Sequence, residues 1–530
     1  MTVEGLRASL ADPYRIGAAL ALLAAVPMIR LAAQCPDGSA PPCRVARPSA
    51  APAANSVAVL YFENRSRDSA DAYLAEGLTE AIITQLGDLP RLTVKSRFLV
   101  RRYRGMAVPA DPAAIGRALG ATYLVTGSVQ RAGNRLRVTA ELARASSGDR
   151  VWGQQYDRGD GDVFAIQEDI ARGVATGVAG RLLPAEAASL AVRPTRNIEA
   201  YDRMLRGDVL LARRDPASVR GAIVEYAAAA RLDPSLASPW ARIGLADAIR
   251  LYWGWGDGTP PPDSILANGW AAADRALALD SSSSDGWMAR GYLLMFRHPR
   301  TWDGAEEAMR RAVALNPRNA EAWQQLGDLL STKSAGHPAA DSVRREAMIA
   351  YQRALDVEPS RPTTLKVLAN IQPSAREQLV LLDSALGINP ADYSIPFFRG
   401  NALLALGDTA SARASADESL RLAPEGARYT GAALRAMLAV QLGDTADARS
   451  RVAALLHELP RAGPLEMWTG SGLATALWQL GDREGARAVL ERMPRGAMTW
   501  ALNLATLRQL DLADPVQRRL YEENRPPWAR

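Results

Sequence analysis

The carboxy-terminal three-fifths of the chain repeat themselves with a period near 34 residues. Short tags that end in proline recur at intervals of 31 to 47 residues, and a serine takes the place of the proline in one tag. The tags end at Pro234, Ser281, Pro317, Pro359, Pro390, Pro424, Pro460 and Pro494. A period of this size is typical of a solenoid, in which each repeat packs on its neighbours and the stack exposes a long surface. The period therefore predicts a binding protein rather than a compact catalytic fold.

The interior of each period predicts a pair of antiparallel helices. Trp240–Gly244 and Trp323–Gly327 both read W-x-x-[IL]-G, and small residues recur at fixed distances before most tags. Two helices approach closely only where a glycine or alanine lets the backbones touch, and a proline ends a helix because it cannot continue it. We therefore expect an all-α superhelical solenoid of eight to nine helix pairs over residues 199–525.

These repeats resemble the tetratricopeptide family over roughly 330 residues. The resemblance implies that the first helix of each pair lines a concave groove that binds a protein or peptide. By their spacing beside the W-x-x-L-G positions, five side chains should project into this groove, although Tyr292 and Phe397 could instead be packing residues. The five are Tyr292, Gln324, Asp328, Phe397 and Asn401.

The amino terminus suggests a membrane segment. After a short tail, 1–15, residues 16–29 carry no charge, and the apolar stretch extends to residue 33. A stretch of 18 residues is at the short end of a membrane span, so 16–33 is interpreted as a transmembrane helix or signal anchor. A cleaved signal peptide and a buried helix remain alternatives. With the cysteines below, this favours a single-pass protein of the bacterial inner membrane whose bulk is extracytoplasmic (periplasmic), although the flanking arginines lean the other way.

Cys35 and Cys43 lie in residues 34–56, a loop and linker rich in proline and alanine, and the chain has no other cysteine. The turn-rich spacer between them brings its ends together, which predicts a disulfide of the kind that persists outside the cytosol. Free thiols or a weak metal site are the alternatives. Two thiolates without a nearby histidine make a poor zinc site.

Residues 57–183 predict a small α/β domain. Val57–Tyr61 and Leu92–Lys95 are short apolar runs suited to buried strands, and helical periodicity follows each of them. Thr122–Gln130 and Arg135–Arg144 flank a glycine-containing turn and predict a hairpin. Strand, helix, strand, helix and hairpin in this order predict an α/β fold.

The same residues resemble the TolB-like amino-terminal domain. The resemblance rests on Val57–Asn64, Leu74–Glu80, Tyr123–Val129 and Trp152–Asp157. In bacteria this module commonly precedes tetratricopeptide repeats, often behind a serine/threonine kinase, a cyclase or a winged-helix domain. In membrane kinases of this kind, a span and a Cys-Pro-Asp-Gly…Pro-Pro-Cys loop come before the module, as Cys35–Cys43 does here. Only about 15 residues precede the apolar stretch, so the resemblance implies a recognition or sensing half without its own output.

The sequence carries no phosphate-binding loop, no kinase signature, no HExxH and no G-x-S-x-G. Glu63, Glu76 and Glu80 could converge as an acid pair, but carboxylates at a helix start are more often dipole partners. Arginines alternate with acids along the helices, which excludes a basic stripe for nucleic acid. We therefore expect a membrane-anchored, non-catalytic scaffold or adaptor without cofactor or metal. The alternatives are a ligand-sensing component whose TolB-like domain signals to a separate kinase, cyclase or transport partner, and an enzyme of unrecognised type.

Overall fold

The computed structural model describes residues 53–68, 71–104, 111–159, 162–191, 193, 195–253, 262–296, 302–334, 339–423, 428–459, 465, 467–492 and 518. The predicted segments 1–15 and 16–33, the cysteines Cys35 and Cys43, and most of residues 493–525 lie outside these ranges. The predicted disulfide therefore stays a prediction.

Within the ranges described, no helix is both long and apolar enough to cross a membrane. The longest, α10 (Pro262–Leu279) and α14 (Ala340–Val357), each carry several charged side chains. This finding contradicts the predicted location as a single-pass inner-membrane protein with an extracytoplasmic bulk. The transmembrane helix in the predicted fold class and the membrane as a partner are likewise without support.

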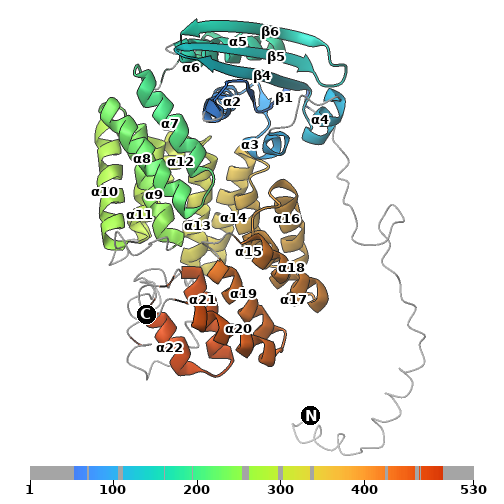
Figure 1. The fold of residues 1–530 in the computed structure, drawn as a ribbon, viewed down its shortest axis with the longest axis vertical. Helices are drawn as coiled ribbons and strands as arrows, with labels where there is room; N and C mark the ends of the chain where they lie inside the picture. Colours follow the sequence, from blue (N-terminus) through green and yellow to red (C-terminus); the bar gives the residue numbers. More distant parts are fainter. Residues whose placement is uncertain are drawn as a thin grey trace, which may run out of the picture. The chain divides into compact units, whose positions relative to one another are not determined.

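The amino-terminal domain contains a mixed sheet with strand order β3-β1-β4-β5-β6 (Figure 1). The short β1 pairs in parallel with both β3 and β4, whereas β4, β5 and β6 form an antiparallel meander. A two-residue β2 pairs with the end of β4. The strands are β1 (Ser56–Val59), β2 (Glu63–Asn64), β3 (Thr93–Val94), β4 (Tyr123–Ala132), β5 (Arg135–Arg144) and β6 (Arg150–Gly159).

Helices cover both faces of the parallel part of this sheet. On one face, α2 (Ala72–Gly87) and α5 (Val163–Ala179) share a core with the inward side chains of β5, which alternate along the strand. On the other face, α4 (Pro112–Leu119) and Val100 of α3 (Arg97–Val100) pack against Ala58 and Leu124. The 3-10 helix η3 (Arg101–Tyr103) follows α3. The small α/β domain of the predicted fold class is thereby confirmed.

Eight helix pairs follow within the described residues, and each helix packs on its partner and on the next pair. The solenoid part of the predicted fold class is thereby confirmed, and we number the pairs as repeats 1 to 8. The pairs are α7 (Ile198–Leu211) with α8 (Pro216–Leu232), α9 (Ser238–Trp253) with α10, α11 (Ser284–Leu294) with α12 (Trp302–Leu315), α13 (Ala320–Ser334) with α14, α15 (Pro362–Ile371) with α16 (Ala375–Ile388), α17 (Ser394–Ala405) with α18 (Thr409–Leu422), α19 (Arg428–Gln441) with α20 (Thr445–Glu458), and α21 (Met467–Gln479) with α22 (Arg483–Glu491).

A glycine–tyrosine contact sets the spacing within repeats 1 and 4. Tyr226 packs on Gly207 and Tyr351 packs on Gly327, and both tyrosine side chains are fully buried. A Cβ atom on Gly327 would lie 2.5 Å from the Tyr351 ring, and one on Gly207 would lie 2.4 Å from the Tyr226 ring. The glycines are therefore required because the ring of the second helix occupies the space of their missing side chain.

Repeat 1 and the α/β domain share one hydrophobic core. Tyr201 and Leu205 of α7 belong to the same buried cluster as Leu78 of α2. Leu205 also approaches Gly77 closely, and the Gln167 amide of α5 donates a hydrogen bond of 2.7 Å to the Tyr201 hydroxyl. The first repeat is therefore anchored on the α/β domain by apolar packing.

The glycine–tyrosine contact leads to a stability prediction. Replacing Gly327 with Ala should lower the free energy of unfolding by about 1–3 kcal/mol, because the added methyl group overpacks the Tyr351 ring. Replacing Gly387 with Ala is the matched control. No atom lies within 4 Å of a Cβ there, so it should be neutral or stabilise by about 0.5 kcal/mol through helix propensity. Urea denaturation followed by circular dichroism measures both, and equal effects would contradict the packing account.

Candidate functional site

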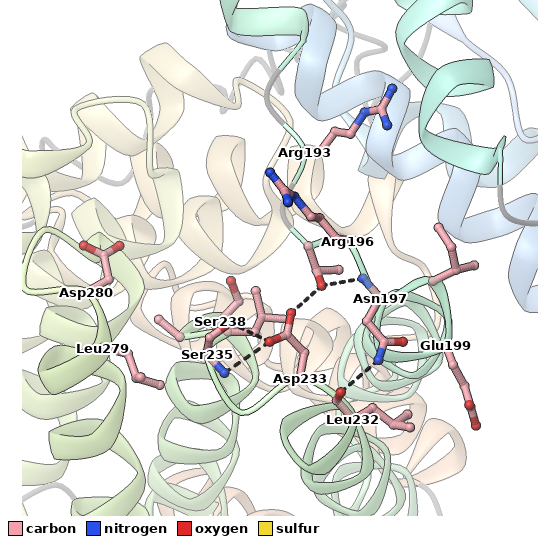
Figure 2. A pocket seen from close by; sticks show the side chains of 14 residues that line it. Arg193, Arg196, Asn197, Glu199, Leu232, Asp233, Ser235, Ser238, Leu279 and Asp280 are labelled. Carbon is pink, nitrogen blue, oxygen red and sulfur yellow. Dashed lines mark hydrogen bonds between the residues drawn. The ribbon is translucent and has the colours of Figure 1, made fainter.

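A cavity of about 1080 Å³ lies where the linker into repeat 1 meets the first two repeats (Figure 2). Its polar walls bond to one another. The Thr195 hydroxyl donates to Asp233, and the backbone N–H of Ser235 donates to the same carboxylate at 3.1 Å. The Asn197 amide donates to the Leu232 carbonyl at 2.8 Å. These hydrogen bonds connect the linker to the Leu232-Asp233-Pro234 tag. The polar groups of the cavity wall are therefore used to hold the linker in place and are not available to bind a ligand.

The first helices of the pairs form the inner layer of the solenoid. Helices α9, α11 and α13 contact one another in sequence, and the same holds for α13, α15 and α17. Helices from successive repeats that contact one another directly form the more tightly curved layer, so this layer lines the concave face. We call this layer the inner face.

Two acids of the inner face are held in place by the glycine–tyrosine contact. The Tyr226 hydroxyl donates a hydrogen bond of 2.7 Å to Asp208, and the Tyr351 hydroxyl donates one of 2.8 Å to Asp328. Each acid directly follows the glycine on which its tyrosine packs. Burial raises the pKa of both carboxyl groups, that of Asp328 to about 6. The hydrogen bonds fix the two carboxylates but do not fully offset their loss of water.

Arg242 of α9 joins the inner faces of repeats 1, 2 and 3. Its guanidinium lies 3.5 Å from Asp208 of α7 and 3.5 Å from Asp285 of α11. Asp285 and Asp208 hold the pKa of Arg242 above its ordinary value, although burial opposes them. Asn319 donates a further hydrogen bond of 2.9 Å to Asp285 from the loop before α13. One half-buried cation thus connects acids from the two repeats that flank its own.

Glu321 of α13 joins repeats that are distant in sequence. Arg214, which follows α7, donates to it at 2.6 Å across 107 positions of the chain, and Arg361 lies 3.8 Å away at the start of α15. Burial alone would raise the pKa of Glu321, but Arg214, Arg361 and Arg242 outweigh it and bring this pKa to about 2. Asp208, Arg214, Arg242, Asp285, Glu321 and Arg361 are called the inner-face charge network below.

The backbone of Arg214 supports a specific role for this pair. Arg214 has a φ of 56°, and among the described residues it is the one non-glycine with a left-handed backbone. This conformation costs an arginine about 1–2 kcal/mol. The surrounding structure therefore holds Arg214 in a position from which its side chain reaches Glu321.

The structure places the five predicted groove residues differently from one another. Gln324 is 7% exposed, and its side-chain oxygen accepts hydrogen bonds from Arg361, Thr363 and Thr364. It is therefore not a free groove position, because a neighbouring repeat uses its acceptor. Asp328 is held by Tyr351, as described above. Whether any of these residues binds a partner stays a prediction.

The two aromatic residues among the five, Tyr292 and Phe397, are packing residues in the structure. Tyr292 is buried between Tyr252 and Phe296, with ring centroids 6.0 and 5.8 Å away. Phe397 is buried against Phe398, with centroids 5.3 Å apart.

Asn401 of α17 is the fifth. Its side-chain oxygen is buried, and no hydrogen-bond partner for it is found within the described part of the chain. A buried acceptor without a partner is uncommon and requires an explanation.

Sequence reasoning missed the cations of the network. The available signal was the Gly-Asp pair that occurs at Gly207-Asp208 and again at Gly327-Asp328, each with a tyrosine in the following helix. Arg214, Arg242 and Arg361 showed no periodic spacing because their partners lie in other repeats.

The acids of the α/β domain form ion pairs instead of an acid–base dyad. Tyr61 donates to Glu80 at 3.0 Å, Arg97 lies 3.4 Å from the same carboxylate, and Arg104 pairs with Glu76. Glu63 pairs elsewhere, with Arg65 at 2.9 Å. The structure therefore brings together only Glu76 and Glu80 of the predicted trio. Each of these two carboxylates has a cation beside it.

Comparison with known proteins gives distant matches. No family model matches the chain. A protein of Rhizobium meliloti (strain 1021) named "Putative adenylate cyclase 3" is 30% identical over 261 residues, which is 49% of this chain and 43% of that protein. The chain thus spans less than half of this relative.

Solved structures resemble the chain at low identity. Yeast Tom70 is 15% identical, with 69% of this chain and 82% of Tom70 covered and a TM-score of 0.38. PilF of Pseudomonas aeruginosa is 19% identical, with 43% and 94% covered and a TM-score of 0.32. YrrB, described as a TPR protein with an unusual peptide-binding site, is 15% identical, with 41% and 97% covered and a TM-score of 0.27. The solenoid is established by the helix contacts described above.

The two acids of α13 should respond oppositely to pH. The folded pKa of Asp328, about 6, lies above the unfolded value, so its stabilising contribution is present below about pH 4 and is lost as pH rises through 6. Asp328→Asn should therefore gain about 1 kcal/mol of stability relative to wild type between pH 5 and 7.5. Glu321→Gln should show a constant loss over this window, because the folded pKa of about 2 is depressed. Urea titrations at several pH values measure both, and parallel profiles would contradict the assignment.

Proposed function

We propose that this chain is a non-catalytic protein-interaction module that binds an extended segment of a partner protein against the inner face of its solenoid. The observation that carries the proposal is Glu321, held by Arg214 from repeat 1 and lying 3.8 Å from Arg361 of repeat 5. Buried ion pairs contribute little net stability, and apolar residues of similar volume often replace them without loss. A network of this kind on the concave face is therefore better explained by recognition than by stability.

Asn401 supports an extended segment as the ligand. Its buried side-chain oxygen lies on the inner face of repeat 6 and accepts no hydrogen bond from the described residues. A backbone N–H of a bound chain could satisfy it once the half-buried side chain rotates toward the groove. Contacts at repeat 6 and at repeats 1 to 5 together suit a long segment rather than a small molecule.

A regulatory reading is the second candidate, and the resemblance to the TolB-like domain favours it. The match of 261 residues to a protein named as an adenylate cyclase points the same way. Under this reading the α/β domain senses a ligand and passes the signal to a separate kinase, cyclase or transport partner. The ion pairs of Glu76 and Glu80 would then respond to the ligand. Loss of partner binding on deletion of residues 57–183, with the inner face intact, would favour this reading.

The non-catalytic proposal can be checked against the cyclase-named relative. Purified chain incubated with ATP and Mn²⁺ should form cyclic AMP no faster than a heat-denatured sample, because no cluster of three or more acids, histidines or cysteines among the described residues could hold a metal ion. Chromatographic detection of cyclic AMP measures the rate. Formation above the denatured control, abolished by Glu76→Gln or Glu80→Gln, would overturn the proposal.

Photo-crosslinking tests where the partner binds. Ala405 is exposed one turn after Asn401 on α17, and Val224 on α8, in the second helix of its pair, is 65% exposed. With p-benzoylphenylalanine at Ala405, illumination in cells should give a defined adduct, because this position lies on the inner face. The same amino acid at Val224 is the matched control and should give none. Equal adducts from both positions, or adducts from Val224 alone, would contradict binding on the inner face.

A further inference from the structure

Two consecutive residues of the α/β domain reach the inner face of repeats 4 and 5. The guanidinium of Arg361 lies over the Phe98 ring, 5.6 Å from its centroid. The edges of the same guanidinium are occupied within the solenoid, because Nε donates to Gln324 at 3.0 Å and Nη1 donates to Glu358 at 2.9 Å. Phe98 therefore covers a face of a cation whose edges are already bonded, and Arg361 is only 4% exposed.

Arg97, the neighbour of Phe98 in the chain, lies within electrostatic range of acids of the same surface. Burial would lower the pKa of this guanidinium, but Glu80, Glu358 and Glu321 together raise it. Glu80 belongs to the α/β domain, whereas Glu321 and Glu358 both belong to repeat 4. Burial raises the pKa of Asp208 in repeat 1, and Arg97 is one of the cations that oppose this rise. One arginine of the domain thus interacts electrostatically with acids from two repeats.

We propose that Arg97 and Phe98 occupy the partner's binding site in the free protein. The inner face then recognises a partner segment in which an arginine adjoins an aromatic residue. The proposal rests on the proposed function, and it adds that the partner must displace Arg97-Phe98 to reach the network. Arginine suits a site that contains both an aromatic ring and carboxylates, because its planar guanidinium stacks on aromatic rings and forms bidentate hydrogen bonds with carboxylates. The partner's aromatic ring would take the place of Phe98 on Arg361, and its arginine would face Glu321 and Glu358.

The contacts show which part of the interface can open. Arg97 and Phe98 are both partly exposed. Phe98 makes a cation–π contact with the solenoid, and Arg97 interacts with its acids electrostatically. The packing of α2 on α7 is apolar and shares a core. Release of Arg97-Phe98 would leave that anchor in place. Their removal should therefore free the site without separating the domain from repeat 1.

The same segment contains a matched control. Arg102 and Tyr103 form another arginine–aromatic pair, with the guanidinium 5.3 Å from the ring centroid. Arg102 donates to the Ala118 carbonyl of α4, so this pair belongs to the α/β domain. Replacing it removes the same kinds of side chain without touching the described contacts to the inner face.

The test uses the full chain and a fluorescein-labelled peptide of residues 96–104 (SRFLVRRYR) as probe, with fluorescence anisotropy as the measurement. The variant Arg97→Ala/Phe98→Ala should bind the probe about tenfold more tightly than wild type, because the site is no longer occupied from within. The control Arg102→Ala/Tyr103→Ala should bind it like wild type. Adding Glu321→Gln and Glu358→Gln to the first variant should weaken binding by about tenfold. Arg361→Lys, added separately, should weaken it similarly because an ammonium lacks the planar stack.

Thermal melts confirm that each variant is folded. If the variant with Glu321→Gln and Glu358→Gln does not fold, Arg361→Lys alone tests the site. Equal probe affinity of wild type, the Arg97/Phe98 variant and the control would overturn the proposal. The proposal would also be overturned if the Arg97/Phe98 variant still bound the probe with unchanged affinity after Glu321→Gln/Glu358→Gln was added, and likewise after Arg361→Lys was added. An adduct at Ala405 together with either of these results would leave the proposed function standing and reject only the arginine–aromatic class of partner.

Discussion

The contact between a glycine of one helix and a tyrosine ring of the next is the constraint on which the inner face depends. At Gly207 and Gly327 a missing Cβ lets Tyr226 and Tyr351 lie against the backbone of the first helix. The two tyrosine hydroxyls then reach Asp208 and Asp328 on the concave side. The same tyrosine therefore does two things in these repeats: its ring sets the helix spacing, and its hydroxyl orients the acid.

The inner-face charge network extends this arrangement over several repeats. Arg242 connects Asp208 with Asp285, and Glu321 lies between Arg214 and Arg361. Such groups lose hydration when they are buried, and their mutual attraction often only offsets that loss. The fold retains them even though Arg214 must adopt a left-handed backbone. A surface that holds oriented, partly buried charges in fixed positions is well suited to select a charged ligand.

The architecture was largely predictable from the sequence, whereas the site was not. Period, small residues and tags report contacts within a repeat, so the helix pairs and the packing role of Gly327 could be inferred. The local spacing did not show that the Gln324 acceptor is used by Arg361, 37 positions away in the next repeat. Arg214 finds Glu321 only through the curvature of the stack, which no local pattern encodes. The membrane location was wrong because it rested on a local apolar run at the amino terminus, and no described helix has the length and apolarity of a span.

The most direct test of the account separates stability from recognition in the network. A variant with Arg214→Met, Glu321→Leu and Arg361→Met replaces three charged groups with apolar side chains of similar volume. Its urea midpoint and its adduct formation from p-benzoylphenylalanine at Ala405 would be measured together. The account predicts a midpoint equal to or above that of wild type, because buried ion pairs add little stability, together with loss of the adduct. A markedly lower midpoint with the adduct retained would contradict it and would make the network a structural device.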